Sequence, residues 1–186
     1  MHVEKIIKRI NSGIFALKKM SFLCSLSVLK TIFCAHIQSH IAYGISIYGG
    51  TSSQNLKKIL ILQKKAIRTM LKLKNDVSVK HHFAELNILT VHSLYILECI
   101  MHCKTHIGQF KSNSDFHSYN TRNRHDKIIP QHRLEYFAKK TSYAGLKFFK
   151  YVPNEIKEIN DSGKFRKSLK EFLMQKALYS LDEFCM

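Results

Sequence analysis

Apolar side chains recur at helical spacing along most of the chain. Between residues 3 and 20 they return every three or four positions with lysines between them, and residues 25–48 form a second long apolar segment. This period is typical of helices that bury one face. We expect Asn11-Ser12-Gly13 to interrupt the first helix and Gly49-Gly50 to end the second.

The most regular amphipathic pattern predicts a helix from about Ser53 to Lys74. Thr51 and Gln54 have the spacing of a capping box, which is typical of a helix start. One side of the segment is apolar and carries Leu56, Ile59, Leu60, Gln63, Ala66, Ile67, Met70 and Leu71. The other side is basic and carries Lys57, Lys58, Lys64, Lys65, Arg68 and Lys72. Residues 55–75 contain no acidic residue, which is unusual for an ordinary solvated helix.

Three further helices follow from the same reasoning. The pattern predicts a short helix from about Val79 to Leu86, then a helix from Val91 to about Ile107 capped by Thr90. The latter is apolar nearly all round, so it should lie at the centre of the molecule. A last amphipathic helix begins at Ser162-Gly163.

The predicted fold is therefore mostly α. We expect a helical bundle over residues 1–107, a polar linker over 108–142 and a smaller helical segment over 143–186. A short β pair is possible within the linker, between Ile128-Ile129 and Tyr136-Phe137. The chain has only 7 Gly and 2 Pro, and so few turn-forming residues favour helices over sheets.

Charge narrows the choice of partners. The 186 residues include 30 Lys and Arg against 13 Asp and Glu, a net charge of +17. Such a charge draws a protein to polyanions, first nucleic acid and then an acidic membrane surface. Lys58, Lys65 and Lys72 recur every seven residues with Arg68 beside them, so one helix face could follow a phosphate backbone. The alternative is a solvated surface.

A second candidate contact lies in the linker. Arg122 and Arg124 follow Tyr119 there, and this combination suits contacts to single strands or to the backbone. A polar loop in a basic protein is an equally good interpretation.

Other chemistry finds little support in the sequence. The five cysteines are odd in number and irregularly spaced, so they form no disulfide framework. Cys99, Cys103 and His106 line one side of a helix, but only the distant Cys185 offers a fourth ligand for zinc, so buried thiols are the better interpretation. We expect no metal, no cofactor and no small-molecule substrate. Without a signal peptide or a transmembrane segment, the expected location is intracellular, nuclear or cytoplasmic.

Catalysis is not expected of this chain. Two-metal phosphoryl transfer needs closely placed carboxylates, and the sequence contains no Asp-Asp pair. The aspartates are isolated from one another along the chain, at Asp76, Asp115, Asp126, Asp161 and Asp182. No glycine-rich phosphate loop is present either.

Five segments together resemble a known family. They are residues 40–49 (HIAYGISIYG), 62–68 (LQKKAIR), 83–90 (FAELNILT, with Tyr95 after it), 117–122 (HSYNTR) and 153–157 (PNEIK). In this order they are similar to landmarks of jockey-like non-LTR retrotransposon reverse transcriptases, over nearly the whole chain. Tyr48 stands where the family usually has tryptophan, and Tyr151-Val152-Pro153 replaces a longer motif.

The resemblance implies the thumb and the C-terminal segment of an RNA-directed DNA polymerase. A thumb grips the template–primer duplex, made of RNA or DNA, through its backbone. The family's palm and its Asp pair have no counterpart here, so no catalytic residue can be carried over. Alternative interpretations are a polymerase that works within a longer product, an inert transposon relic, and a helical adaptor for proteins or membrane surfaces.

The missing carboxylate pair gives a direct prediction. The purified chain should incorporate no nucleotide on a primed RNA template with magnesium, measured by primer extension. Incorporation that follows the protein through successive purification steps would contradict this prediction.

Overall fold

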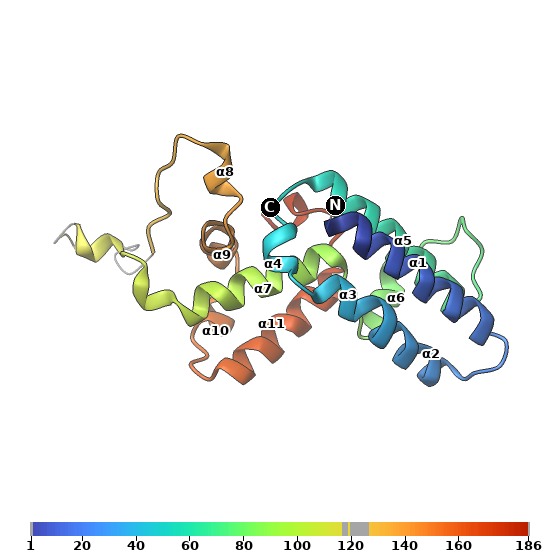
Figure 1. Ribbon diagram of the computed structural model, residues 1–186. Coiled ribbons are helices and arrows are strands. Elements are labelled where there is room, and N and C mark those ends of the chain that lie inside the picture. The colour runs from blue at the N-terminus through green and yellow to red at the C-terminus, as the bar shows by residue number, and fades with distance from the viewer. Residues whose placement is uncertain (1, 117–118, 120–126, 186) are drawn as a thin grey trace.

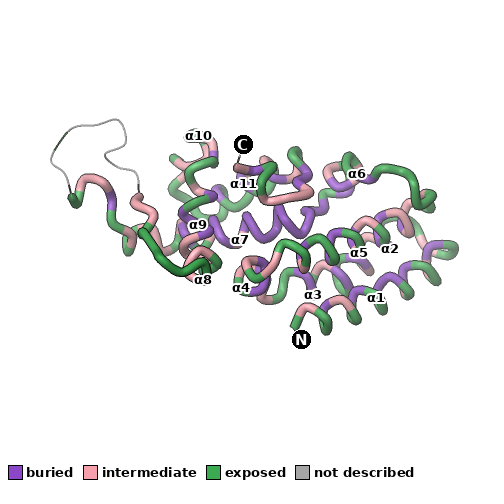
Figure 2. Tube along the Cα trace, turned by 90° about the horizontal axis from the view of Figure 1, so that it is seen from above, coloured by how far each residue is buried: buried purple, intermediate pink, exposed green. Residues whose placement is uncertain are grey.

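A helix buried on every side forms the centre of the molecule. In the computed structural model, which describes residues 2–116, 119 and 127–185, this is α7 (Val91–Thr105). Its buried residues include Leu94, Ile96 and Leu97 on different sides of the helix, and Figure 2 shows most of its length purple. Its last turn reaches the surface, with His102 and Thr105 exposed. The prediction of a central helix after Thr90 is confirmed, as is the mostly α fold class.

Two groups of helices enclose α7 (Figure 1). The first contains α1 (His2–Met20), α2 (Leu26–Phe33), α3 (Ser39–Ala42), α4 (Ile45–Tyr48) and α5 (Ser53–Leu71). The second contains α9 (Thr141–Lys150), α10 (Asn154–Lys157) and α11 (Ser162–Lys176), while α6 (Lys80–Glu85) and α8 (Glu135–Ala138) are short connecting helices. One hydrophobic core runs through both groups, from Ile6 to Phe184.

The closest helix contacts depend on glycine. Gly145 of α9 lies directly against the carbonyl of Cys99 and the Cβ of Cys103 on α7, where a side chain would not fit. Gly13 of α1 lies against the turn that follows α2, and a Cβ there would be 2.7 Å from Ile37 Cγ1. The expected interruption of α1 at Asn11-Ser12-Gly13 is therefore wrong, because Gly13 serves helix packing within a continuous helix.

Residues 25–48 do not form one long helix, contrary to expectation. After α2 the chain makes a π-helical turn over Cys34–Gln38 and continues as α3. Gly44 then adopts a left-handed conformation with φ 69°, which separates α3 from α4. The Tyr48 hydroxyl donates to Ile41 O at 2.5 Å and ties the two short helices together. A wider helical turn and a single glycine thus override the apolar period.

The boundaries of α5 also differ slightly from the prediction. Ser52 is the N-cap, and its hydroxyl accepts the Gln54 N–H at 3.2 Å. The Thr51 hydroxyl is occupied elsewhere, because it donates to Tyr48 O at 2.6 Å. The helix ends at Leu71 rather than Lys74, since Lys72 takes a left-handed conformation with φ 55°.

The possible β pair in the linker is wrong. Tyr136 and Phe137 belong to α8, so they cannot pair as a strand with Ile128-Ile129. In the described part of the chain, β pairing is limited to one isolated bridge between Ser112 and Lys127.

The start of α7 is a buried polar junction. Gln63 of α5 is fully buried; its Oε1 accepts the Val91 N–H at 2.8 Å, and its Nε2 donates to Leu89 O at 3.2 Å. The Thr90 hydroxyl accepts the Ser93 N–H at 3.1 Å and donates to Leu178 O at 2.6 Å. The junction therefore joins α5, α7 and the segment after α11.

His92 is buried beside this junction, and one nitrogen of its ring has no hydrogen-bond partner among the described residues. This nitrogen is Nδ1, and the residue is 2% exposed. Burial lowers its pKa from 6.5 to about 4; the Glu183 carboxylate partly offsets this, and Lys57 and Lys64 add to it. His92 is therefore neutral in the folded protein near pH 7.

We predict that Gln63→Met destabilises the fold although it preserves side-chain volume. Val91 N–H and Leu89 C=O would lose their buried partner, at a cost of about 1–3 kcal/mol for each group. Urea unfolding measures the loss, with Gln54→Met at the exposed start of the same helix as the matched control. Equal free energies of unfolding for the two variants would contradict the stabilising role given to the Gln63 hydrogen bonds.

We also predict that stability falls as the pH drops from about 6.5 to 4. In that window the unfolded chain binds a proton at His92 and the folded chain does not, so the lowered pKa costs up to about 3 kcal/mol. His92→Phe should flatten the pH dependence, measured by urea unfolding between pH 7.5 and 4.5, and His36→Phe at an exposed position should not. An unchanged slope in His92→Phe would refute the assignment.

Candidate nucleic-acid interface

The basic side of α5 faces outward because its apolar side is buried. Leu56, Ile59, Leu60, Ile67 and Met70 lie in the core, as the amphipathic pattern predicted. Of the cations on the other side, Lys64 and Arg68 are half-buried, and the exposed members are Lys57, Lys58, Lys65 and Lys72. The structure thus brings these six predicted residues onto one surface of the molecule.

One edge of this surface borders the C-terminal segment. Lys64 Nζ lies 3.9 Å from the centroid of the Tyr179 ring, and Lys80 Nζ lies 5.3 Å from the same centroid. Partial burial, and then the nearby Arg68 guanidinium, lower the pKa of Lys64. Lys80 also forms an ion pair with Glu183 at 3.5 Å. Cations on this edge are therefore partly engaged within the protein.

The other edge borders α1 and contains a basic hollow. Its volume is about 440 Å³, and it lies where the C-terminal ends of α1 and α5 meet. It is lined by Lys18, Ser21, Phe22, Lys65, Arg68, Thr69, Lys72, Leu73 and Asn75. Four of these residues are cations, and none of the described lining residues is acidic.

One cation of the basic hollow is held in place by a hydrogen bond. Arg68 Nε donates to Val77 O at 3.0 Å, which fixes the guanidinium at the junction of α5 and the following loop. Lys72 is the last of the four along the chain, and its left-handed backbone turns the chain away from the helix axis. Phosphate oxygens are acceptors of the kind that such converging donors bind.

Lys18 and Phe22 were not among the candidate residues from the sequence. Lys18 belongs to the exposed side of α1, and Phe22 follows that helix in the turn to α2. The helical period indicates that both are exposed, but it carries no signal that they meet α5. Arg122 and Arg124, the predicted contacts in the linker, lie outside the described residues.

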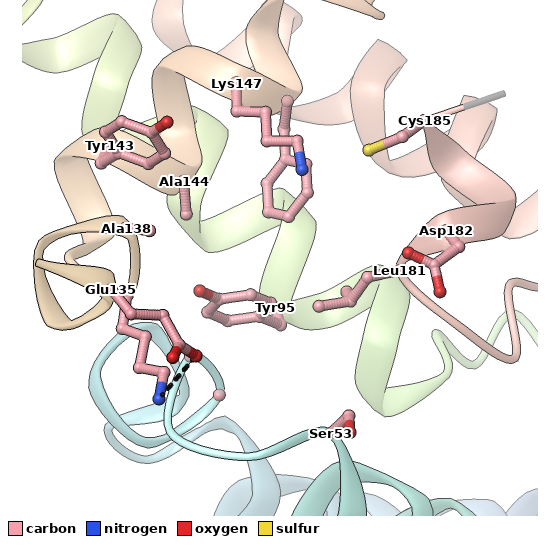
Figure 3. Close-up of a pocket in the computed structure, with 14 residues that line it drawn as sticks. Ser53, Tyr95, Glu135, Ala138, Tyr143, Ala144, Lys147, Leu181, Asp182 and Cys185 are labelled. Atoms are coloured by element: carbon pink, nitrogen blue, oxygen red, sulfur yellow. Dashed lines mark ion pairs between the residues drawn. The ribbon is translucent and has the colours of Figure 1, made fainter. Parts of the chain in front are cut away.

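A second pocket lies between α4, α7, α8, α9 and the C-terminal turn (Figure 3). It has a volume of about 260 Å³ and an ion pair of 3.4 Å between Glu135 and Lys139 at its edge. Gly49 and Gly50 border this pocket. The Tyr95 ring packs directly onto Gly49, and the Lys139 carbonyl and the Tyr95 hydroxyl lie against Gly50, so neither position has room for a side chain.

Three buried or half-buried thiols, those of Cys99, Cys103 and Cys185, are not activated as nucleophiles. Burial raises the pKa of Cys185, which lines the second pocket, so its thiol stays protonated near neutral pH. Burial likewise raises the pKa of Cys99 to about 12 and that of Cys103 to about 11. The Cys99 backbone and the Cys103 Cβ lie against Gly145 of α9, while His106 Nδ1 contacts His102 O at 2.8 Å.

One group of possible metal ligands was missed in the sequence. His81, His82 and Glu85 on α6 have donor atoms within 4.8 Å of one another. His82 Nδ1 lies 2.7 Å from Glu85 Oε2, so the two side chains already form a hydrogen bond. A structural zinc site needs four ligands, and this group supplies three. Two adjacent histidines followed by a glutamate one helical turn later are the sequence signal.

Comparison with known proteins identifies no relative of this chain, so any function must be argued from the geometry and charge of these residues. No helix in the described ranges combines the length and the apolar character that crossing a bilayer requires. Searches against models of protein families, curated proteins and solved structures gave no match for this chain.

Proposed function

We propose that this chain binds the sugar–phosphate backbone of nucleic acid through the basic side of α5. The observation that supports this most strongly is the basic hollow, in which Lys18, Lys65, Arg68 and Lys72 converge without a carboxylate among the described lining residues. Surface cations that only keep a protein soluble are normally interspersed with acids. A site of this composition selects an anion with several negative oxygens.

The spacing of the exposed lysines supports an extended polyanion. An α-helix rises 1.5 Å per residue, so Lys58 and Lys72 are about 21 Å apart along α5, with Lys65 midway. A single phosphate group cannot span this distance, whereas a nucleic-acid strand presents phosphates along its whole length. Because phosphates carry no base identity, the proposed binding is independent of sequence.

The resemblance to jockey-like reverse transcriptases suggests an origin for such a surface. We propose that the chain corresponds to the thumb and post-thumb part of an RNA-directed DNA polymerase, without catalysis of its own. Gln63, Lys64, Lys65 and Arg68 all fall in the segment that resembles the family's LQ motif. The buried glutamine positions α5, and the cations that follow it face outward.

A membrane-surface adaptor is the second candidate function. It is favoured by Phe22 and Leu23, which are 78% and 81% exposed beside the basic hollow. Apolar side chains next to cations are typical of proteins that bind anionic bilayers.

A charge-neutralising triple variant tests the proposed function. Lys65→Gln, Arg68→Gln and Lys72→Gln together should make the slope of log affinity against log salt shallower by about two to three units on duplex DNA. Affinity should fall equally on unrelated sequences, measured by fluorescence anisotropy. Lys65 and Lys72 are exposed, so their replacement should change folding stability by less than about 0.5 kcal/mol each. Loss of the Arg68 hydrogen bond to Val77 O should add about 0.5–1.5 kcal/mol, so urea unfolding is used to choose conditions in which the variant is fully folded.

The matched control removes the same charge from another helix. Lys164, Lys167 and Lys170 are exposed on α11, and their triple Gln variant should leave the salt slope nearly unchanged. Equal changes in both triple variants would mean that net charge alone attracts DNA. An unchanged slope in the α5 variant would mean that the basic side is only a solvated surface.

A further inference from the structure

We propose that the basic hollow holds an unpaired nucleotide, with its phosphate among the cations and its base stacked on Phe22. This inference rests on the proposed function and specifies its ligand as single-stranded rather than fully paired nucleic acid. Phe22 lines the hollow together with Lys18, Lys65, Arg68 and Lys72. An aromatic ring beside a group of cations is the arrangement that single-strand-binding proteins use.

The turn after α1 holds Phe22 at this position. Ser21 is buried; its N–H donates to Leu17 O at 2.8 Å and its hydroxyl donates to Lys18 O at 2.9 Å. Cys24 N–H donates to Met20 O at 2.9 Å on the other side of the ring's attachment point. Phe22 is thus presented by a hydrogen-bonded backbone, although it is 78% exposed and gains little from burial.

The Phe22 side chain is exposed to solvent and has one cation over its ring. Lys72 Nζ lies 5.7 Å from the centroid of the Phe22 ring, so one cation of the hollow is close to the aromatic side chain. A nucleobase on Phe22 would therefore have its own phosphate within reach of Lys72 and its neighbours. Base and phosphate are joined by one sugar, which matches the close placement of the ring and the cations.

Base pairing decides which nucleic acid can use this ring. Bases inside a duplex are stacked on both faces by their neighbours, whereas an unpaired base can offer a face to an aromatic side chain. The α5 cations contact phosphates in either form. Phe22 should accordingly add affinity for single strands and overhangs only.

A lipid headgroup would use the same cations but fits the geometry less well. Arg68 is half-buried and its Nε donates to Val77 O, so it is less open to a flat bilayer than the exposed Lys65 and Lys72 are. A membrane would instead engage the protruding Leu23, which is not among the lining residues. Phe22 is available to either ligand, whereas Leu23 would contact only a bilayer, so Leu23 is the side chain that distinguishes the two.

The test compares Phe22→Leu with a matched variant of a second exposed phenylalanine. Phe15 is 64% exposed on α1 with Lys19 Nζ 5.6 Å from its ring, but it does not line the hollow. Binding is measured by fluorescence anisotropy at one salt concentration, on a 20-nucleotide single strand and on a blunt 20-base-pair duplex. Phe22→Leu should weaken single-strand binding about tenfold, as expected for the loss of one stacked base.

Four further results should accompany this loss. Duplex binding by Phe22→Leu should stay within about twofold of the wild type. Phe22→Tyr should restore single-strand binding, and Phe15→Leu should bind both ligands as the wild type does. The salt slope of Phe22→Leu should equal that of the wild type, because no phosphate contact is removed.

Other outcomes overturn the inference in distinguishable ways. Unchanged single-strand binding by Phe22→Leu, with the expected salt effect of the α5 triple variant, would refute base stacking and leave backbone binding intact. If Phe22→Leu leaves single-strand binding unchanged and the α5 triple variant also leaves the salt slope unchanged, both proposals are refuted. Stronger binding to phosphatidylcholine vesicles containing 30% phosphatidylserine than to the single strand, abolished by Leu23→Ser, would identify a bilayer as the ligand instead.

Discussion

The arrangement of the helices depends on the hydrogen bonds that the Gln63 side chain of α5 makes to the backbone at the start of α7. A helix buried on all sides cannot leave its first N–H groups to water, so the protein must supply acceptors for them. Gln63 Oε1 accepts from Val91 N–H, and the Thr90 hydroxyl accepts from Ser93 N–H. Because Gln63 comes from α5, this requirement acts together with burial of the apolar side of α5 to set the rotation of that helix against the core.

That rotation places the cations. With Gln63 turned inward, Lys65 and Lys72 fall on the opposite side and reach solvent beside α1. A lysine on the core-facing side of α5 would be buried without a partner for its charge, which costs a large free energy. The cations of α5 are therefore confined to its outward side. The proposed binding surface thus follows from burial of the apolar side of α5, on which the Gln63 hydrogen bonds also lie.

Features that depend on the helical spacing of apolar residues could be predicted from the sequence. Features that depend on tertiary contacts or on local hydrogen bonds could not. The outward side of α5 and the burial of α7 follow from helical spacing, and both are correct. The unbroken α1 through Gly13, the left-handed Gly44 and the cap at Ser52 were missed, because packing and local hydrogen bonds decide them. Phe22 has no sequence signal, since its meeting with α5 is a tertiary event.

Lysine footprinting tests most directly whether the basic side of α5 is the binding surface. The protein is acetylated at a limiting reagent concentration with and without a 20-nucleotide single strand, and modification of each lysine is measured by mass spectrometry. Binding at the proposed surface predicts that Lys65 and Lys72 lose reactivity, while Lys164 and Lys170, exposed on α11, keep theirs. Equal protection on both helices, or protection of α11 alone, would contradict it.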